Sequence, residues 1–233
     1  MTLVLTAHGS IDPRSAAVTH AVAGRIRRLR PWLDVRPAFL ERTSPSLGDV
    51  LAETTDAVVV PFLLASAFHA RVDIPAVIEE SGSRLYQADV LGEDPALLAV
   101  LRHRLAEAGV SPHENGLGVV VVAVGSSNPA ANARTATVAS TLGIGTRWAG
   151  AQMAFATGPY ANLAETTEEL RARGADRLVI APWFLAPGKI TDRVGDFAAQ
   201  QGISMSEPLG SHNLVAATVL DRYDAVTGAA VAA

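Results

Sequence analysis

The chain has 233 residues, of which 49% are hydrophobic and 18% charged, and its formal net charge is −4. This composition is that of a well-packed globular protein rather than a disordered one, and the weak negative charge gives no reason to expect nucleic acid as a partner. Because the chain has no cysteine, it has no disulfide, no thiolate metal site and no cysteine nucleophile, which leaves His, Asp and Glu for metal chemistry.

The amino-terminal region shows no targeting pattern. Residues 3–7 form a short apolar run without the basic segment and long apolar core of a signal peptide. No stretch reaches the roughly 18 apolar residues that a membrane helix requires. We therefore expect a cytoplasmic protein that has no membrane partner.

In the first half, short runs rich in Val, Leu and Ile alternate with helical patterns. The runs are nearly continuous rather than alternating, which is typical of strands buried on both faces of a parallel sheet. We expect strands at residues 3–7, 35–40, 57–64 and 85–91. We expect helices at residues 16–29, 46–54, 74–81 and 95–108, where apolar positions recur at helical spacing.

The second half repeats this plan. Strands are expected at residues 118–124, 148–155, 177–185 and 204–208. Helices are expected at residues 129–141, 162–173, 189–201 and 213–227. The polar, glycine-containing residues 109–116 have the character of a linker. The sequence therefore predicts an α/β protein with two tandem lobes, 1–114 and 115–233, each a parallel sheet flanked by helices.

The two halves also match residue by residue, with one difference that concerns chemistry. Ala-His-Gly-Ser-Ile-Asp-Pro at 7–13 corresponds to Ala-Val-Gly-Ser-Ser-Asn-Pro at 123–129, and residues 60–69 correspond to residues 181–190. His8 is thus replaced by Val124, and His69 by Lys189 or Ile190. We expect one lobe with metal-handling histidines and a second lobe without them.

His8 and His69 follow the first and third expected strands. Ligands of open parallel sheets bind beyond the carboxyl ends of the strands, so both side chains are expected at the same rim. Neutral imidazole is a good ligand for Fe, Co, Ni or Zn. The alternative is that each histidine is a turn residue bonded to the backbone.

Two carboxylates lie near the same rim. Glu41 follows the second expected strand, where it can bind metal or accept protons, or equally cap a helix or pair with a cation. Asp73, four residues after His69, can serve the same site or provide a favourable charge at a helix amino terminus, and we prefer the second interpretation.

The segment Gly9-Ser10 offers backbone N–H groups to an anion, although it is no P-loop. Ser10 beside His8 and Asp12 also raises the possibility of a serine hydrolase. The GxSxG nucleophile motif of that class is absent, which argues against it.

These residues resemble a known family. The Leu-Thr-Ala-His-Gly-Ser-Ile-Asp-Pro-Arg segment at 5–14, residues 61–69 running on to Asp-Ile-Pro at 73–75, and Glu41 with Pro-Ser-Leu at 45–47 look like the sirohydrochlorin chelatases of the CbiX and SirB type. The resemblance implies two flavodoxin-like lobes around a cleft and a class II chelatase that inserts Fe(II) or Co(II) into sirohydrochlorin without ATP. It assigns metal handling to His8 and His69, and an acidic role to Glu41.

The same resemblance directs attention to groups that would meet the tetrapyrrole and its carboxylates. Candidate substrate contacts are Ser10, Arg14, Arg42, Phe68, Arg71 and Lys189, each alternatively a surface residue. Candidate apolar walls are Phe62, Phe68, Trp183 and Phe184, alternatively core. The chain departs from the family pattern at Ala67 and Phe68, which replace the usual glycine before the second histidine.

The expected partners are sirohydrochlorin and a divalent metal ion, with no further cofactor. Two fused copies can take the place of a homodimer, so we expect a monomer. Nickel insertion remains an alternative, because the Irving–Williams order does not select iron. A metal or tetrapyrrole binding protein without turnover is another alternative, although a pure binder has no need for proton acceptors.

Overall fold

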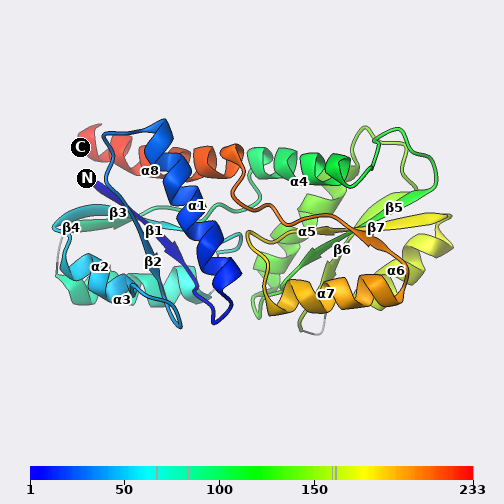
Figure 1. Cartoon of the computed structure of the whole chain (residues 1–233), viewed down its shortest axis with the longest axis horizontal. Coiled ribbons are helices and arrows are strands. Elements are labelled where there is room, and N and C mark those ends of the chain that lie inside the picture. The colour runs from blue at the N-terminus through cyan, green and yellow to red at the C-terminus, as the bar shows by residue number, and fades with distance from the viewer. Residues whose placement is uncertain (67, 83, 159, 161, 233) are drawn as a thin grey trace. The chain divides into compact units, whose positions relative to one another are not determined.

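The computed structural model describes residues 1–66, 68–82, 84–158, 160 and 162–232, and contains two four-stranded parallel sheets (Figure 1). Residues divide into two compact units: Met1–Asp94 with Ser211–Ala233, and Pro95–Gly210. Each unit has its own sheet and its own helices. The expected α/β class and the tandem parallel sheets are confirmed.

The sheet of the first unit has the strand order β2-β1-β3-β4. Its strands are β1 (Thr2–Ala7), β2 (Val35–Phe39), β3 (Asp56–Pro61) and β4 (Arg84–Gln87). Its helices are α1 (Pro13–Leu29), α2 (Leu47–Ala52), α3 (Ile74–Ser81) and α8 (Asn213–Ala232). Helix α1 packs beside α8, and α2 beside α3, on opposite faces of the sheet (Figure 1).

The sheet of the second unit has the equivalent order β6-β5-β7-β8. Its strands are β5 (Leu117–Ala123), β6 (Gly150–Phe155), β7 (Arg177–Pro182) and β8 (Ser204–Met205). Its helices are α4 (Pro95–Glu107), α5 (Pro129–Gly143), α6 (Leu163–Ala172) and α7 (Lys189–Gln200). Helix α4 packs on α5 and β7.

The burial of the central strands β1 and β5 explains why their sequences are nearly continuous apolar runs. Leu3, Val4 and Leu5 in β1 are fully buried, as are the four valines at 119–122 in β5. Each strand has parallel neighbours on both edges and helices on both faces, so almost every position along it is buried and most of these positions are apolar. The near-continuous apolar runs are the direct consequence.

The compact units do not coincide with the predicted lobes 1–114 and 115–233. Helix α8, from the second sequence repeat, packs on α1 and β3 of the first unit, whereas α4, from the first repeat, belongs to the second unit. Residues 109–116, the expected linker, also lie inside the second unit. Sequence similarity identifies which helices are equivalent, but it does not identify the sheet on which each one packs.

Polar contacts hold α8 in the first unit. Arg222 donates to the carbonyls of Val90 and Leu91, at 3.0 and 2.8 Å, and to a carboxylate oxygen of Asp94 at 2.8 Å. The Tyr223 hydroxyl donates to the carbonyl of Met1 at 2.8 Å, and burial raises the pKa of this phenol. These bonds supplement the buried apolar face of the helix.

The structure also differs from the expected elements. Strand β4 ends at Gln87 rather than at residue 91, and β8 has only two residues. A π-helical turn, His69–Asp73 (η1), precedes α3 and was not expected. Within the described residues, no helix is both long enough and apolar enough to cross a membrane.

Candidate functional site

The loops after β1, β2 and β3 carry His8, Glu41 and His69. His8 directly follows β1, Glu41 lies two residues beyond β2, and His69 begins η1 after β3. Strand β1 lies between β2 and β3 in the parallel sheet, so the three loops emerge at the same edge. The order of the strands, rather than closeness in sequence, brings these side chains together.

The two histidine rings are in contact. Their centroids lie 4.2 Å apart and their planes are almost perpendicular, at 88°. Both side chains are partly open to solvent, with 42% of His8 and 40% of His69 exposed. The structure thus brings together the two residues that the sequence places 61 positions apart.

Hydrogen bonds define which ring nitrogen of each histidine is available. His8 Nδ1 lies 3.0 Å from the carbonyl oxygen of Gly9, and His69 Nδ1 lies 2.5 Å from Oδ2 of Asp73. A carbonyl and a carboxylate can only accept, so we assign a proton to Nδ1 of both rings. Nε2 is then the nitrogen of each ring that is left to act as a base or a metal ligand.

Glu41 lies opposite His8. Its Oε1 is 3.4 Å from His8 Nε2, and its Oε2 is 3.6 Å from Nε of Arg42. If His8 is neutral with a proton on Nδ1, then Nε2 and the carboxylate direct lone pairs at each other. Such a contact is favourable only with a proton on Nε2 or a cation between the two groups. The pair is therefore suited to exchange a proton for a metal ion.

The backbone fixes the distance between the loops of His8 and Glu41. The Glu41 N–H donates to the His8 carbonyl at 3.0 Å. The Thr43 hydroxyl donates to the Ser10 carbonyl at 2.9 Å and accepts from the Ser10 N–H at 3.0 Å. Gly9 has a φ of +90°, and a Cβ added there would stand 1.8 Å from the Glu41 carbonyl oxygen. Only glycine fits this close approach.

Several predicted substrate contacts are engaged within the protein. The Ser10 hydroxyl accepts from the Asp12 N–H at 3.0 Å, which makes Ser10 part of a turn. Arg14 Nη2 lies 2.6 Å from Oδ2 of Asp12, the residue that caps α1. Arg42, with a left-handed φ of 59°, follows Glu41 in sequence, and Arg71 lies two residues after His69; both are exposed.

The predicted apolar walls separate into two groups. Phe62, Trp183 and Phe184 are buried and belong to the core, so they do not form a wall for a ligand. Phe68 is 62% exposed, and its ring centroid lies 6.2 Å from that of His69. Its neighbour Ala67 lies outside the described residues.

The matching edge of the second unit has a different chemistry. Val124, at the position of His8, is partly exposed, and Asn132 bonds both the N–H and the carbonyl of Ser126. Lys189, at the first residue of α7, is exposed. The second copy keeps the glycine turn, since Gly125 has a φ of +94°, but it lacks the imidazoles.

Asp73 was weighed at the sequence level but was not included among the predicted site residues. It was interpreted as a charge at a helix terminus, yet its side chain makes no capping hydrogen bond and lies on His69 instead. The spacing of four residues from His69 was the available signal, because residues four apart share one face of a helix.

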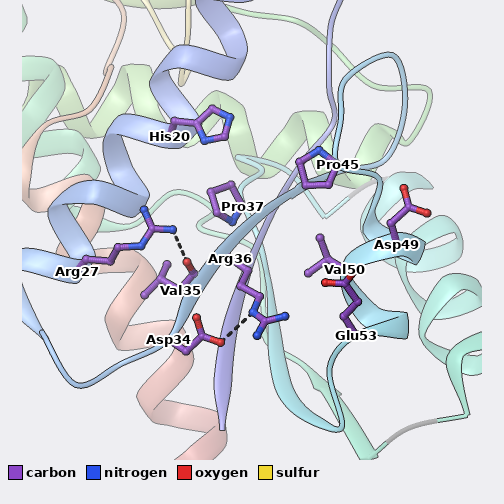
Figure 2. Close-up of a pocket in the computed structure, with 10 residues that line it drawn as sticks. All are labelled: His20, Arg27, Asp34, Val35, Arg36, Pro37, Pro45, Asp49, Val50 and Glu53. Atoms are coloured by element: carbon purple, nitrogen blue, oxygen red, sulfur yellow. Dashed lines mark hydrogen bonds and ion pairs between the residues drawn. The ribbon is translucent and has the colours of Figure 1, made fainter.

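A separate pocket of about 460 Å³ lies along the outer edge of β2, between α1 and α2 (Figure 2). Its charged side chains largely bond to the protein itself: Arg27 to the Val35 carbonyl, Arg36 to Asp34, and Asp49 to the backbone of Ser46. None of the residues that line it is His8, Glu41 or His69. The pocket is therefore distinct from the histidine site.

Among the described residues, no group of three or more His, Asp or Glu side chains has the arrangement of a metal-binding cluster. A resident structural metal normally has four protein ligands. The arrangement of His8, Glu41 and His69 does not meet that description.

Comparison with known proteins shows a family match over both repeats. The family model described as CbiX matches residues 2–108 and again residues 118–226. The chain is 27% identical over 179 residues to the sirohydrochlorin cobaltochelatase of Priestia megaterium, an alignment that covers 71% of the chain and 58% of that relative. It is 26% identical over 206 residues to the sirohydrochlorin ferrochelatase of the same organism, covering 81% of the chain and 77% of the relative.

The fold has a counterpart among solved structures. The structure of SirB from Bacillus subtilis with Fe3+ superposes with a TM-score of 0.82, covering 98% of each chain at 22% identity. At this identity the superposition establishes a common fold, including the tandem parallel sheets.

Proposed function

Because the chain belongs to the CbiX family, whose model matches both of its repeats, we propose that it inserts a divalent metal ion, Fe(II) or Co(II), into sirohydrochlorin. The products are siroheme with iron and cobalt-sirohydrochlorin with cobalt. The two relatives from Priestia megaterium, a cobaltochelatase and a ferrochelatase, support both metals equally. The proposed reaction needs no ATP and no cofactor beyond the metal substrate.

The contact between His8 Nε2 and Glu41 Oε1, with the His69 ring beside it, is the observation that carries this proposal. Insertion of M2+ into the macrocycle releases two pyrrole N–H protons, and the charge balances only if bases accept them. The imidazoles and Glu41 can bind the incoming ion and take up protons as the ion leaves. The same side chains would thereby deliver the metal ion and accept the pyrrole protons.

The small number of protein ligands is consistent with metal transfer. A catalytic metal site keeps open positions for water or substrate. Here the open positions would be filled first by water and then by pyrrole nitrogens.

The second unit is proposed to contribute to substrate binding. Sirohydrochlorin carries many carboxylates, and Lys189 stands where the first repeat has the region of His69. We propose that Lys189 binds such carboxylates, and we make the same proposal separately for Arg42 and Arg71 of the first unit. Phe68, the exposed aromatic residue beside His69, is assigned to contact with the macrocycle face.

The test is an insertion assay under anaerobic conditions. Purified protein is mixed with sirohydrochlorin and Fe(II), Co(II) or Ni(II) in turn, and the absorption of the macrocycle is followed. We expect insertion of Fe(II) or Co(II) above the uncatalysed rate, and none above that rate in His8→Ala or His69→Ala. His103→Ala, which changes an exposed histidine on α4, is the matched control.

Full activity in both histidine variants would contradict the assigned roles. Tight binding of sirohydrochlorin without any acceleration by wild-type protein would instead indicate a binding protein. A preference for Ni(II) would change the assigned metal while leaving the reaction class intact. A cytoplasmic location is part of the proposal, and cell fractionation tests it.

A further inference from the structure

Asp73 forms a short contact with the nitrogen of His69 that lies nearest the backbone. Its Oδ2 is 2.5 Å from Nδ1, and the two side chains are 36% and 40% exposed. The residue stands at the cap position of α3, but its carboxylate bonds to no backbone N–H of that helix. The contact with the imidazole therefore accounts for the orientation of this side chain better than helix capping does.

The nitrogen that is used distinguishes this pair from an ordinary surface pair. On α4, His103 and Glu107 have the same spacing of four residues, but there the contact involves Nε2, at 3.2 Å from Oε1. Such a contact occupies the outer nitrogen. In the pair of His69 with Asp73 the inner nitrogen is occupied, and the outer one is left for another partner.

The π-helical turn provides this geometry. Its first residue is His69 and its last is Asp73, so the turn itself carries both members of the pair. The adjacent His8 ring is also bonded through Nδ1, in this case to the Gly9 carbonyl. Histidines that bind metals typically donate their other N–H to a carboxylate or a backbone carbonyl, and the two rings show one example of each.

We propose that Asp73 is a positioning residue that holds the proton of His69 on Nδ1 and thereby presents the Nε2 lone pair to the divalent metal ion. This inference rests on the proposed function and deepens it. The negative charge of the carboxylate also makes the imidazole a stronger electron donor to the ion. Asp73 acts through His69 and needs no contact with the metal or the tetrapyrrole.

The first measurement reads the tautomer directly. Long-range 1H–15N correlation spectra of the histidine rings, recorded at alkaline pH without metal, distinguish a proton on Nδ1 from one on Nε2. We expect His69 to carry its proton on Nδ1 in wild-type protein and in Asp73→Asn, whose amide oxygen still accepts a hydrogen bond. We expect Asp73→Ala to show protonation of Nε2 in a substantial fraction of molecules.

The second measurement is binding of Co(II) alone, followed by its visible absorption bands. Loss of such an outer partner typically weakens metal binding about 10- to 100-fold, and we expect this loss in Asp73→Ala. Asp73→Asn should fall between Asp73→Ala and wild type, since it keeps the hydrogen bond and loses the charge. Glu107→Gln, which alters the pair on α4, should bind as wild type does.

In the insertion assay, the Asp73 variants should raise the KM for metal while the KM for sirohydrochlorin stays unchanged. Equal Co(II) affinity in wild type and Asp73→Ala, or a wild-type His69 with its proton on Nε2, would overturn the inference. If Asp73→Ala does not fold, Asp73→Asn has the same shape and still decides through its Co(II) affinity. If the wild-type protein has no insertion activity but the Asp73 variants bind Co(II) more weakly, the proposed function is disproved and the role of Asp73 is retained.

Discussion

The His8 and Glu41 side chains lie close enough that each affects whether the other binds a proton or a cation. A lone pair on Nε2 faces a carboxylate oxygen 3.4 Å away, so a positive particle between them lowers the energy of both. In the proposed reaction, a proton and a divalent ion compete for that position. This competition would couple uptake of the metal ion to loss of a proton at a single residue pair.

Neutralising Glu41 tests this coupling. In Glu41→Gln the amide cannot take up a proton, so we expect the rate of insertion to fall about 100-fold, the lower end of what a positioned base contributes. Initial rates of macrocycle metallation measure the effect. Glu80→Gln, which removes an exposed carboxylate from α3, should keep the wild-type rate, and an equal rate in Glu41→Gln would exclude proton transfer to Glu41.

Lys189 can be tested independently of the metal. It is the single lysine of the chain and is exposed at the start of α7. Lys189→Ala should raise the KM for sirohydrochlorin about 3- to 10-fold, the value of one exposed charge-assisted bond, while the dependence on metal concentration stays the same. Arg173→Ala, at the end of α6, serves as the control. Unaltered substrate affinity in Lys189→Ala would contradict its role in binding carboxylates.

At the scale of elements, the glycine turns after β1 and β5 are equivalent in geometry and differ in their neighbours. Gly9 has a φ of +90° and Gly125 a φ of +94°. A Cβ would overlap the Glu41 carbonyl in the first case and would stand 2.6 Å from the Thr157 carbonyl in the second. Substitutions of Gly9 and Gly125 can therefore be compared to separate an effect on folding stability from an effect on metal binding.

We expect Gly9→Ala and Gly125→Ala each to lower the free energy of unfolding by about 1–3 kcal/mol, because an alanine at these positions is forced into the left-handed backbone conformation. Only Gly9→Ala should also weaken Co(II) binding, because it displaces the loop of Glu41 from His8. Thermal unfolding and Co(II) titration measure the two effects. Gly24→Ala, inside α1, should stabilise the protein by about 0.5–1 kcal/mol. Equal Co(II) affinity in Gly9→Ala and Gly125→Ala would show that the turn does not position Glu41.

The elements that could be predicted are those in which local pattern and packing agree. The apolar runs of β1 and β5 and the stripe of α1 identified a parallel α/β fold, and the ends of β1 and β3 placed His8 and His69 at one edge. The site of Asp73 could not be predicted in full, because a π-helical turn has no sequence signature that separates it from the start of an α-helix. Phe62 and Trp183 were ambiguous since an aromatic residue after a strand suits a core as well as a wall.

The helices α4 and α8 were located correctly in sequence, but their packing partners were not. Both are apolar helices that follow the last strand of a repeat, and each repeat predicts that its final helix covers its own sheet. The residues that settle the matter for α8 are Arg222 and Asp224, which bond to Asp94 and Arg30 of the first unit. Ion pairs of this kind cannot be predicted from the sequence, because their partners are known only when the position of the helix is known.

At the scale of the whole chain, this arrangement predicts which fragments fold. Residues 95–210 contain one complete unit, whereas residues 115–233 lack α4 and carry α8 without its partners. We expect fragment 95–210 to unfold cooperatively on heating and fragment 115–233 to aggregate, because α8 buries Val215, Val219 and Leu220 in the intact protein. Circular dichroism and light scattering distinguish the two results. A cooperative transition in 115–233 would show that α8 is dispensable for the second repeat.

The duplication also predicts the oligomeric state. Two copies in one chain can provide what two subunits provide in a homodimer, so we expect the protein to be a monomer of 24.3 kDa. Multi-angle light scattering after gel filtration measures this mass. A mass twice as large at micromolar concentration would contradict the expectation.

The placement of α8 also governs the order in which the protein acquires its structure during synthesis. The ribosome completes residues 95–210 while the first unit still lacks the segment 211–233, so the unit that does not contain His8 and His69 has all its parts first. The unit with His8, Glu41 and His69 can close its core only after α8 has been synthesised. A nascent chain therefore carries these three side chains on an unfinished scaffold until residues 211–233 have left the ribosome, and we expect metal capture, if it takes place at this site, to begin only after that point.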